Sequence, residues 1–171
     1  MKRFAMMTGL LLLAAAPASA QVGFGPQVSW ADDMDLGVGA RFTFPLTQVA
    51  SPEEDSPLSD MLIIGSFDWF FPNDDTADVD VSYLEINANL AYPLELEELD
   101  PYVGAGVNVA RFSLSSDVAG VPDTSDTEIG VNLLAGLNFF LGSFDAFTEA
   151  RLELGGGEQF VLTAGLLFGG Q

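Results

Sequence analysis

The chain has 171 residues, of which 49% are hydrophobic, and its 25 acidic residues against 5 basic ones give a formal net charge of −20 at pH 7. That charge argues against nucleic-acid binding, which needs a basic surface. The absence of cysteine excludes disulfides, thiol nucleophiles and zinc–thiolate sites, and the absence of histidine removes the usual general base at neutral pH. The length predicts a single domain.

Residues 1–20 have the composition of an export signal. Two basic residues stand near the start, an almost uninterrupted apolar run follows, and Ala18-Ser19-Ala20 has the small-x-small pattern of a signal peptidase site. The apolar run is shorter than the roughly 20 residues that span a bilayer, which favours a cleaved signal peptide over the alternative of an uncleaved membrane anchor. We therefore expect a mature domain of residues 21–171.

Beyond the export signal, apolar and polar residues alternate with a period of two, which is typical of half-buried strands. Acidic, turn-rich stretches separate the alternating segments, and no further apolar run is long enough to predict a membrane-spanning helix. We predict eight strands, over residues 22–30, 36–46, 61–71, 83–92, 102–109, 128–141, 146–154 and 159–168.

Alternation alone fits both a secreted antiparallel sandwich and a membrane barrel. The polar faces are rich in Gly, Asn and Ser, which fit a crowded lumen, and the apolar faces are nearly free of charge over the roughly 9–11 residues of a tilted spanning strand. Aromatic residues collect near the segment ends, as at membrane interfaces: Trp30, Phe44, Trp69, Phe70, Phe71, Tyr92, Tyr102, Phe139, Phe140, Phe160 and Phe168. Because hydrocarbon does not tolerate an open strand edge, the sequence predicts an all-β, eight-stranded antiparallel up-and-down transmembrane β-barrel.

The export signal, the eight segments, the stretch Pro101-Tyr102-Val103-Gly104-Ala105-Gly106-Val107 and the last segment together resemble the small eight-stranded outer-membrane β-barrel family. This family includes the membrane domain of OmpA and the OmpX-like and opacity-protein-like barrels. The resemblance implies a location in the outer membrane of a Gram-negative-type bacterium. It also implies three partners: outer-membrane lipid and, during biogenesis, periplasmic chaperones and the barrel-assembly machinery.

In that family the last strand ends in an aromatic residue that the assembly machinery reads. The corresponding assembly signal here consists of Phe160, Leu162, Ala164, Leu166 and Phe168. Gly169-Gly170-Gln171 follows the final aromatic residue, which departs from the family pattern.

The phase of the alternation points six charged residues into the barrel: Arg41, Asp68, Glu85, Glu149, Arg151 and Glu153. Because an unpaired charge is costly in a narrow interior, we expect a lumenal salt-bridge network in which each arginine serves more than one carboxylate. The resemblance implies that this network blocks a continuous water path. A gated pore, in which the pairs exchange partners, is the alternative. Acid–base catalysis by a pair such as Glu149 and Glu153 is disfavoured by the nearby arginines.

Arg111 interrupts an apolar face. If the alternation continues, it faces outward near the extracellular rim of the apolar band and can contact a lipid phosphate; the alternative is a β-bulge that turns it into the lumen.

The acidic connections contain pairs such as Asp32-Asp33 and Asp74-Asp75 but lack the spaced ligands of a calcium loop, so we predict a solvated surface and no metal site.

We therefore predict a non-enzymatic integral outer-membrane protein with a side-chain-filled lumen that contributes to envelope structure or integrity. We expect it to be a monomer with no catalytic residues, no cofactor and no bound nucleic acid. Two alternatives stay open: a narrow porin-like channel for ions or small solutes, and a surface-binding protein or adhesin that acts through its loops. The barrel enzymes that it resembles use a catalytic histidine, which this chain lacks.

Overall fold

The computed structural model describes residues 22–53, 55–72, 79–94, 96, 99–116, 124–155 and 158–169. The predicted export signal and the Asp74-Asp75 pair lie outside the described residues. The strands are β1 (Gly23–Ala31), β2 (Asp35–Pro45), β3 (Leu62–Phe70), β4 (Val79–Pro93), β5 (Asp100–Ser116), β6 (Thr124–Phe140), β7 (Asp145–Leu154) and β8 (Gln159–Gly169).

The eight strands follow one another around a closed barrel, and every neighbouring pair is antiparallel, including β1 against β8. Closure satisfies the backbone donors and acceptors that an open sheet would leave at its edges. The predicted eight-stranded antiparallel up-and-down barrel is therefore confirmed. None of the described residues belongs to a helix that is long and apolar enough to cross a membrane.

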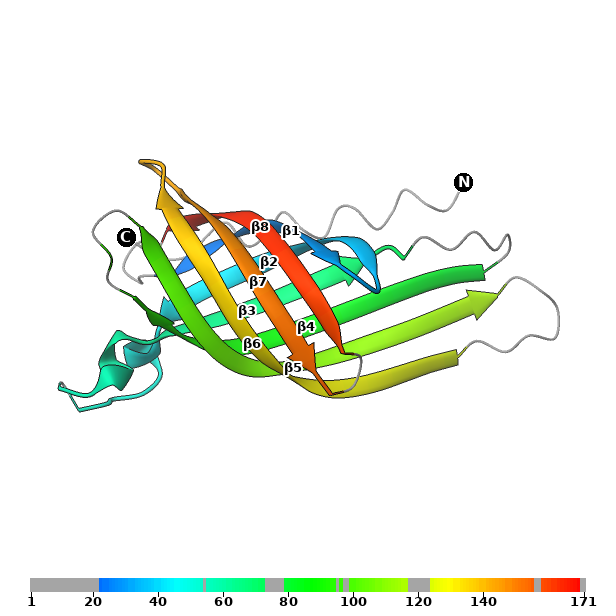
Figure 1. Cartoon of the computed structure of the whole chain (residues 1–171), viewed down its shortest axis with the longest axis horizontal. Coiled ribbons are helices and arrows are strands. Elements are labelled where there is room, and N and C mark those ends of the chain that lie inside the picture. The colour runs from blue at the N-terminus through cyan, green and yellow to red at the C-terminus, as the bar shows by residue number, and fades with distance from the viewer. Residues whose placement is uncertain are drawn as a thin grey trace.

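The two ends of the barrel differ. The end that holds Gly23 and Gly169, here called the proximal end, also carries two 3-10 turns between β2 and β3, η1 (Leu46–Gln48) and η2 (Pro57–Asp60). Figure 1 shows that β4, β5 and β6 continue beyond the other strands at the opposite, distal end. Apolar alternation predicts a fifth strand that ends at residue 109 and a sixth that begins at residue 128. Cross-strand pairing nevertheless continues as far as Leu114 and Thr124.

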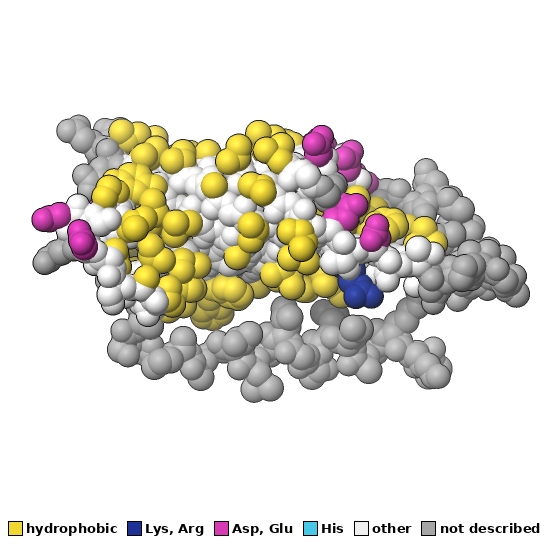
Figure 2. Space-filling model, turned by 90° about the horizontal axis from the view of Figure 1, so that it is seen from below, with side chains coloured by type: hydrophobic (Ala, Val, Ile, Leu, Met, Phe, Trp, Pro, Cys, Tyr) yellow, Lys and Arg dark blue, Asp and Glu magenta, His cyan; other side chains and the backbone are white. Residues whose placement is uncertain are grey.

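The outer wall of the barrel is apolar. In β1 exposed and buried residues alternate without a break, so that Val28 and Trp30 face outward while Gln27 and Ser29 are buried. Figure 2 shows hydrophobic side chains spread over the wall and acidic side chains toward the two ends. Walls that are apolar in the middle and carry charged side chains toward the ends face lipid in transmembrane barrels. Two of the aromatic residues assigned to the membrane interfaces, Phe70 and Tyr102, instead lie inside the barrel, with 0% and 2% exposure.

Glycine makes room for one of these aromatic residues. Tyr102 on β5 pairs with Gly136 on β6. A Cβ at Gly136 would lie 2.3 Å from Tyr102 Cζ and 2.4 Å from its hydroxyl oxygen. The missing side chain therefore lets the tyrosine ring lie against the backbone of Gly136, with its hydroxyl in contact with Arg41 and Glu149.

Candidate functional site

The lumen holds all six charged residues that the alternation pointed inward, and none is more than 3% exposed. They come from four strands: Arg41 on β2, Asp68 on β3, Glu85 on β4, and Glu149, Arg151 and Glu153 on β7. The three β7 residues are spaced by two and therefore share the inner face. Because β7 neighbours neither β2 nor β4, contacts from β7 to Arg41 and Glu85 cross the lumen.

Arg41 has a partner for each guanidinium nitrogen. Its Nη2 lies 2.7 Å from Glu149 Oε1, its Nε donates to Gln27 Oε1 at 3.1 Å, and its Nη1 donates to the Tyr102 hydroxyl at 3.0 Å. The Tyr102 hydroxyl in turn donates to Glu149 Oε2 at 2.9 Å. The guanidinium carbon also lies 3.9 Å from the ring centroid of Phe147, a cation–π contact. These contacts hold the cation in one position in the lumen.

Arg151 contacts three carboxylates. Its Nη2 lies 2.7 Å from Glu85 Oε1, its Nε donates to Glu153 Oε1 at 2.7 Å, and its Nη1 lies 3.5 Å from Glu149 Oε1. Glu149 Oε1 therefore faces both arginines. The result is one continuous chain of ion pairs that runs from Arg41 through Glu149 to Arg151 and ends on Glu85 and Glu153.

Asp68 is held differently from the other carboxylates. No arginine among the described residues lies within ion-pair distance of it. Its oxygens instead accept hydrogen bonds from Gln27 Nε2 at 2.7 Å, Ser29 Oγ at 2.8 Å and Ser66 Oγ at 3.4 Å. Gln27 also accepts from Arg41, so Asp68 joins the network through a neutral amide. Charge-assisted hydrogen bonds of this kind offset part of the cost of burying a carboxylate.

Neutral polar side chains complete the network, of which the sequence predicts only the charged members. They include Gln27, Ser29, Ser66, Asn87, Asn89, Tyr102, Asn108, Asn132 and Gln159. Asn132 donates to Asn87 at 2.7 Å, and Asn87 donates to Glu85. Gln159 donates to both Glu85 at 3.1 Å and Glu153 at 2.7 Å. The period-two alternation predicts most of these residues on the inner face, but the predicted salt-bridge network contains only charged residues.

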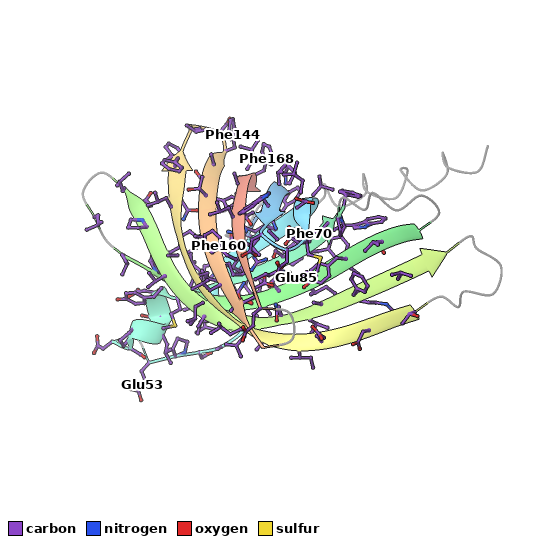
Figure 3. The ribbon with its side chains drawn as sticks, turned by 45° about the vertical axis from the view of Figure 1, so that its right-hand side comes forward. Glu53, Phe70, Glu85, Phe144, Phe160 and Phe168 are labelled. Carbon is purple, nitrogen blue, oxygen red and sulfur yellow. The ribbon has the colours of Figure 1, made fainter. Side chains whose placement is uncertain are left out.

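Apolar side chains fill the lumen on the distal side of the network. Ala31, Phe70, Tyr83, Ala110 and Val161 form one buried cluster, and Met34 and Phe112 pack against it. The rings of Phe70 and Tyr83 meet edge to face, with centroids 5.7 Å apart. Figure 3 shows Phe70 and Glu85 together inside the barrel. An apolar layer of described residues therefore lies between the charged network and the distal end.

The proximal side of the lumen is hollow. A cavity of about 520 Å³ extends from the barrel mouth to Arg41 and Tyr102. Its walls carry Asp100 and Asp145 as well as apolar residues such as Ile64. The lumen is therefore asymmetric, with an open vestibule at the proximal end and a filled section beyond it.

Arg111 is exposed on the outer face of β5 near the distal end. The pairing of β4 with β5 runs residue by residue from Val79 opposite Ser116 to Pro93 opposite Tyr102, without the bulge that would turn Arg111 inward. Its Nη2 donates to Ser125 Oγ at 3.4 Å.

The residues of the predicted assembly signal all lie on β8, and Leu162, Ala164 and Phe168 are exposed on its outer face while Val161, Thr163 and Leu167 are buried. Phe168 packs against Phe144 from the turn between β6 and β7, with ring centroids 5.8 Å apart. Figure 3 shows these two rings together near the proximal end.

The described residues show no arrangement of side chains that indicates a catalytic or metal-binding site. No group of three or more acidic side chains among them is arranged to hold a metal ion. Glu149 and Glu153 are buried against Arg151, which suits a structural network better than proton transfer to a substrate.

Comparisons with known proteins identify relatives of this fold. No family model and no curated protein sequence matches the chain. The N-terminal β-barrel domain of Pseudomonas aeruginosa OprF is similar in structure, with a TM-score of 0.61 and 15% identity over 86% of this chain and 95% of that one. Neisserial surface protein A gives 0.59 and 17% over 86% and 95%. Ail, the attachment invasion locus protein of Yersinia pestis, gives 0.55 and 17% over 86% and 94%.

All three of these structures are small outer-membrane barrels, and each is aligned over nearly its whole length. The shared feature is the closed, antiparallel barrel of eight strands described above. The chain has the fold of the small eight-stranded outer-membrane β-barrels.

Proposed function

We propose that this protein is a non-enzymatic, monomeric barrel of the bacterial outer membrane that serves envelope structure or integrity and keeps its lumen closed. The observation that carries the proposal is the chain of ion pairs from Arg41 through Glu149 to Arg151, whose members are at most 3% exposed. The distal apolar cluster adds a second barrier. In the proposed orientation the proximal end faces the periplasm and the distal end faces outward.

Conductance measurements test the closed lumen. The purified protein, reconstituted into planar bilayers, is expected to show no steady current above that of protein-free membranes. A steady, sizeable conductance that changes in the Arg41→Ala or Arg151→Ala variant would instead show that ions pass through this network. Fractionation with the outer membrane and heat-modifiable gel mobility test the location and the folded barrel.

A narrow channel is the second candidate, and two observations favour it. The vestibule of about 520 Å³ already opens the lumen to the proximal side as far as Arg41 and Tyr102. In the polar layer, Asn89 Nδ2, Asn108 Oδ1 and Asn132 Oδ1 are buried without a protein partner among the described residues. Atoms of this kind suit water as a partner. A channel requires the apolar cluster around Phe70 to move aside, so Phe70→Ala is the variant expected to raise its conductance.

Arg111 is proposed to contact a phosphate group of the surrounding lipid. Its exposed side chain lies on the outer face of the wall, where a long cationic side chain can reach the lipid headgroups. Assembly of Arg111→Glu into the outer membrane is expected to be slower than that of Arg111→Lys, which keeps the positive charge. Equal assembly of the two variants would contradict the phosphate contact and leave the closed lumen untouched.

Biogenesis is proposed to depend on periplasmic chaperones and on the barrel-assembly machinery, which would read the outward residues of β8. This proposal rests on the aromatic residue at position 168 and on the alternation that leads up to it.

A further inference from the structure

A second, smaller pocket lies at the distal mouth, outside the filled part of the lumen. Its volume is about 270 Å³, and it is lined by Met34, Tyr83, Ala110, Phe112, Asp126 and Glu128. Its floor belongs to the distal apolar cluster, because Tyr83 and Ala110 are buried members of that cluster. The pocket therefore lies on the distal side of the ion-pair network, and Tyr83 connects the two because its hydroxyl accepts from Gln159 Nε2 at 3.3 Å.

The strand register explains why a pocket forms here. Tyr83 on β4, Phe112 on β5 and Asp126 on β6 lie opposite one another in one row across three strands. In the next row the central residue is Ala110, with Glu128 opposite it on β6. Ala110 has only a methyl side chain, whereas its neighbours Phe112 and Glu128 have larger ones. The space beside Ala110 therefore stays open.

Two carboxylates meet aromatic rings at this pocket. Asp126 and Glu128 are spaced by two on β6, so they project from the same face. Neither forms an ion pair with a basic side chain among the described residues. Arg111 pairs with Thr127, which lies between them, and therefore points to the other face of the sheet, where it contacts Ser125.

The chemistry of this lining selects one class of ligand. A carboxylate pair attracts a cation, and the aromatic rings of Tyr83 and Phe112 in the lining favour a cation that can shed its water. Calcium takes six to eight oxygen ligands and magnesium keeps several of its waters when it binds, so neither ion gains from contact with an apolar floor. We propose that the pocket binds a small organic ammonium cation, in which methyl or methylene groups cover the positive charge, and that it takes this ligand from the outer side of the barrel.

Methyl NMR of methionine residues tests this proposal, because two methionines lie at opposite ends of the described barrel. Met34 lines the pocket, whereas Met61 lies between η2 and β3 at the proximal end. The full chain, labelled on its methionine methyl groups and folded in octyl glucoside, which has no ammonium headgroup, is titrated with choline. The Met34 signal, assigned with a Met34→Leu variant, is expected to shift and saturate while the Met61 signal stays in place.

Ligand controls separate charge from shape. The neutral isostere of choline, in which a tert-butyl group replaces the trimethylammonium group, is expected to leave the Met34 signal unchanged. Sodium ions at the same concentration are expected to do the same. An equal response to choline and to its neutral isostere would overturn the proposal, because the pocket would then recognise apolar surface alone.

Protein variants locate the binding groups. Replacing both pocket carboxylates, Asp126→Asn with Glu128→Gln, is expected to weaken choline binding about tenfold, since each exposed ion pair contributes modestly. Phe112→Leu keeps a large apolar side chain but removes the ring, and it is expected to weaken choline binding about threefold through loss of the cation–π contact.

The matched control places the same loss of charge at the other end of the barrel. Asp100→Asn with Asp145→Asn changes the walls of the proximal vestibule and is expected to leave choline binding unchanged. Binding that weakens equally in both double variants would show a response to total charge and not to this pocket. All variants are compared only after they show the heat-modifiable mobility of the folded barrel.

Discussion

Glu149 and Arg151 are separated by one residue on β7, yet they join the two halves of the lumenal network. Arg151 Nη1 lies 3.5 Å from Glu149 Oε1, and the same oxygen lies 2.7 Å from Arg41 Nη2. One carboxylate oxygen thus stands between the only two arginines of the described lumen. Arg151 also pairs with Glu85 and Glu153, but Glu149 is the only described carboxylate within ion-pair distance of Arg41, so loss of its charge would leave Arg41 buried without an ion-pair partner.

Glu149→Gln is therefore expected to destabilise the barrel by about 3–5 kcal/mol, the usual cost of leaving a buried charge unpaired. The free energy of unfolding by urea in lipid vesicles measures it. Glu53→Gln removes an exposed carboxylate outside the barrel and is expected to behave like the wild type. Comparable unfolding of both variants would mean that Glu149 does not hold the two cations together.

Gly136 and Tyr102 offer a test of packing inside the lumen. Gly136→Ala places a Cβ at 2.3 Å from Tyr102 Cζ, so the ring must leave its position between Arg41 and Glu149. We expect destabilisation of about 1–3 kcal/mol, as for other overpacked sites. In a double-mutant cycle, Tyr102→Leu is expected to relieve much of that cost, because the clash and the hydrogen bonds involve the same ring. Strictly additive effects would argue against this contact.

The inner and outer faces of the barrel wall can be predicted from the sequence, because side chains of a strand between lipid and lumen alternate between apolar and polar. Val28 and Trp30 are exposed and Gln27 and Ser29 are buried, as the period of two requires. The same rule pointed Arg41 and Arg151 inward. The same alternation places most of the lumenal amides on the inner face, although the predicted network contains only charged residues.

The pairing inside the lumen does not follow from alternation. Arg151 contacts Glu85, which is 66 residues away on a strand across the barrel, and this depends on the registers of all the strands between them. The same holds for Asp68, which faces Gln27 and Ser29 instead of an arginine. The distal extension escaped detection because segments such as Thr124-Ser125-Asp126-Thr127 are polar on both faces, so only pairing with β5 reveals them as strand.

Leu133 and Asn132 are consecutive residues on β6 that face opposite sides. Leu133 is 48% exposed on the outer wall, whereas Asn132 is buried and donates to Asn87 and Asn89. Leu133→Arg is expected to cost about 2–4 kcal/mol in a bilayer, where it places a charge near the middle of the lipid. In detergent micelles, which let the side chain reach water, the cost is expected to shrink.

Asn132→Ser is expected to cost about 1–3 kcal/mol in bilayers and micelles alike, because it breaks buried hydrogen bonds that the solvent does not reach. The comparison uses unfolding free energies of both variants in the two media. A penalty for Leu133→Arg that is independent of the medium would show that this face of β6 does not contact lipid.

A comparison of variants at Phe168 and Phe144 distinguishes a role of Phe168 in assembly from a role in packing alone. The two rings contact each other, so Phe168→Ala and Phe144→Ala each remove the same contact from the folded barrel. Similar unfolding free energies are therefore expected for the two variants, each a few kcal/mol at most below the wild type because both rings lie near the barrel rim. If β8 carries the signal that the assembly machinery reads, Phe168→Ala inserts more slowly into the outer membrane of living cells than Phe144→Ala does. Pulse-chase measurement of heat-modifiable protein gives the two insertion rates, and equal rates would reduce the role of Phe168 to its contact with Phe144.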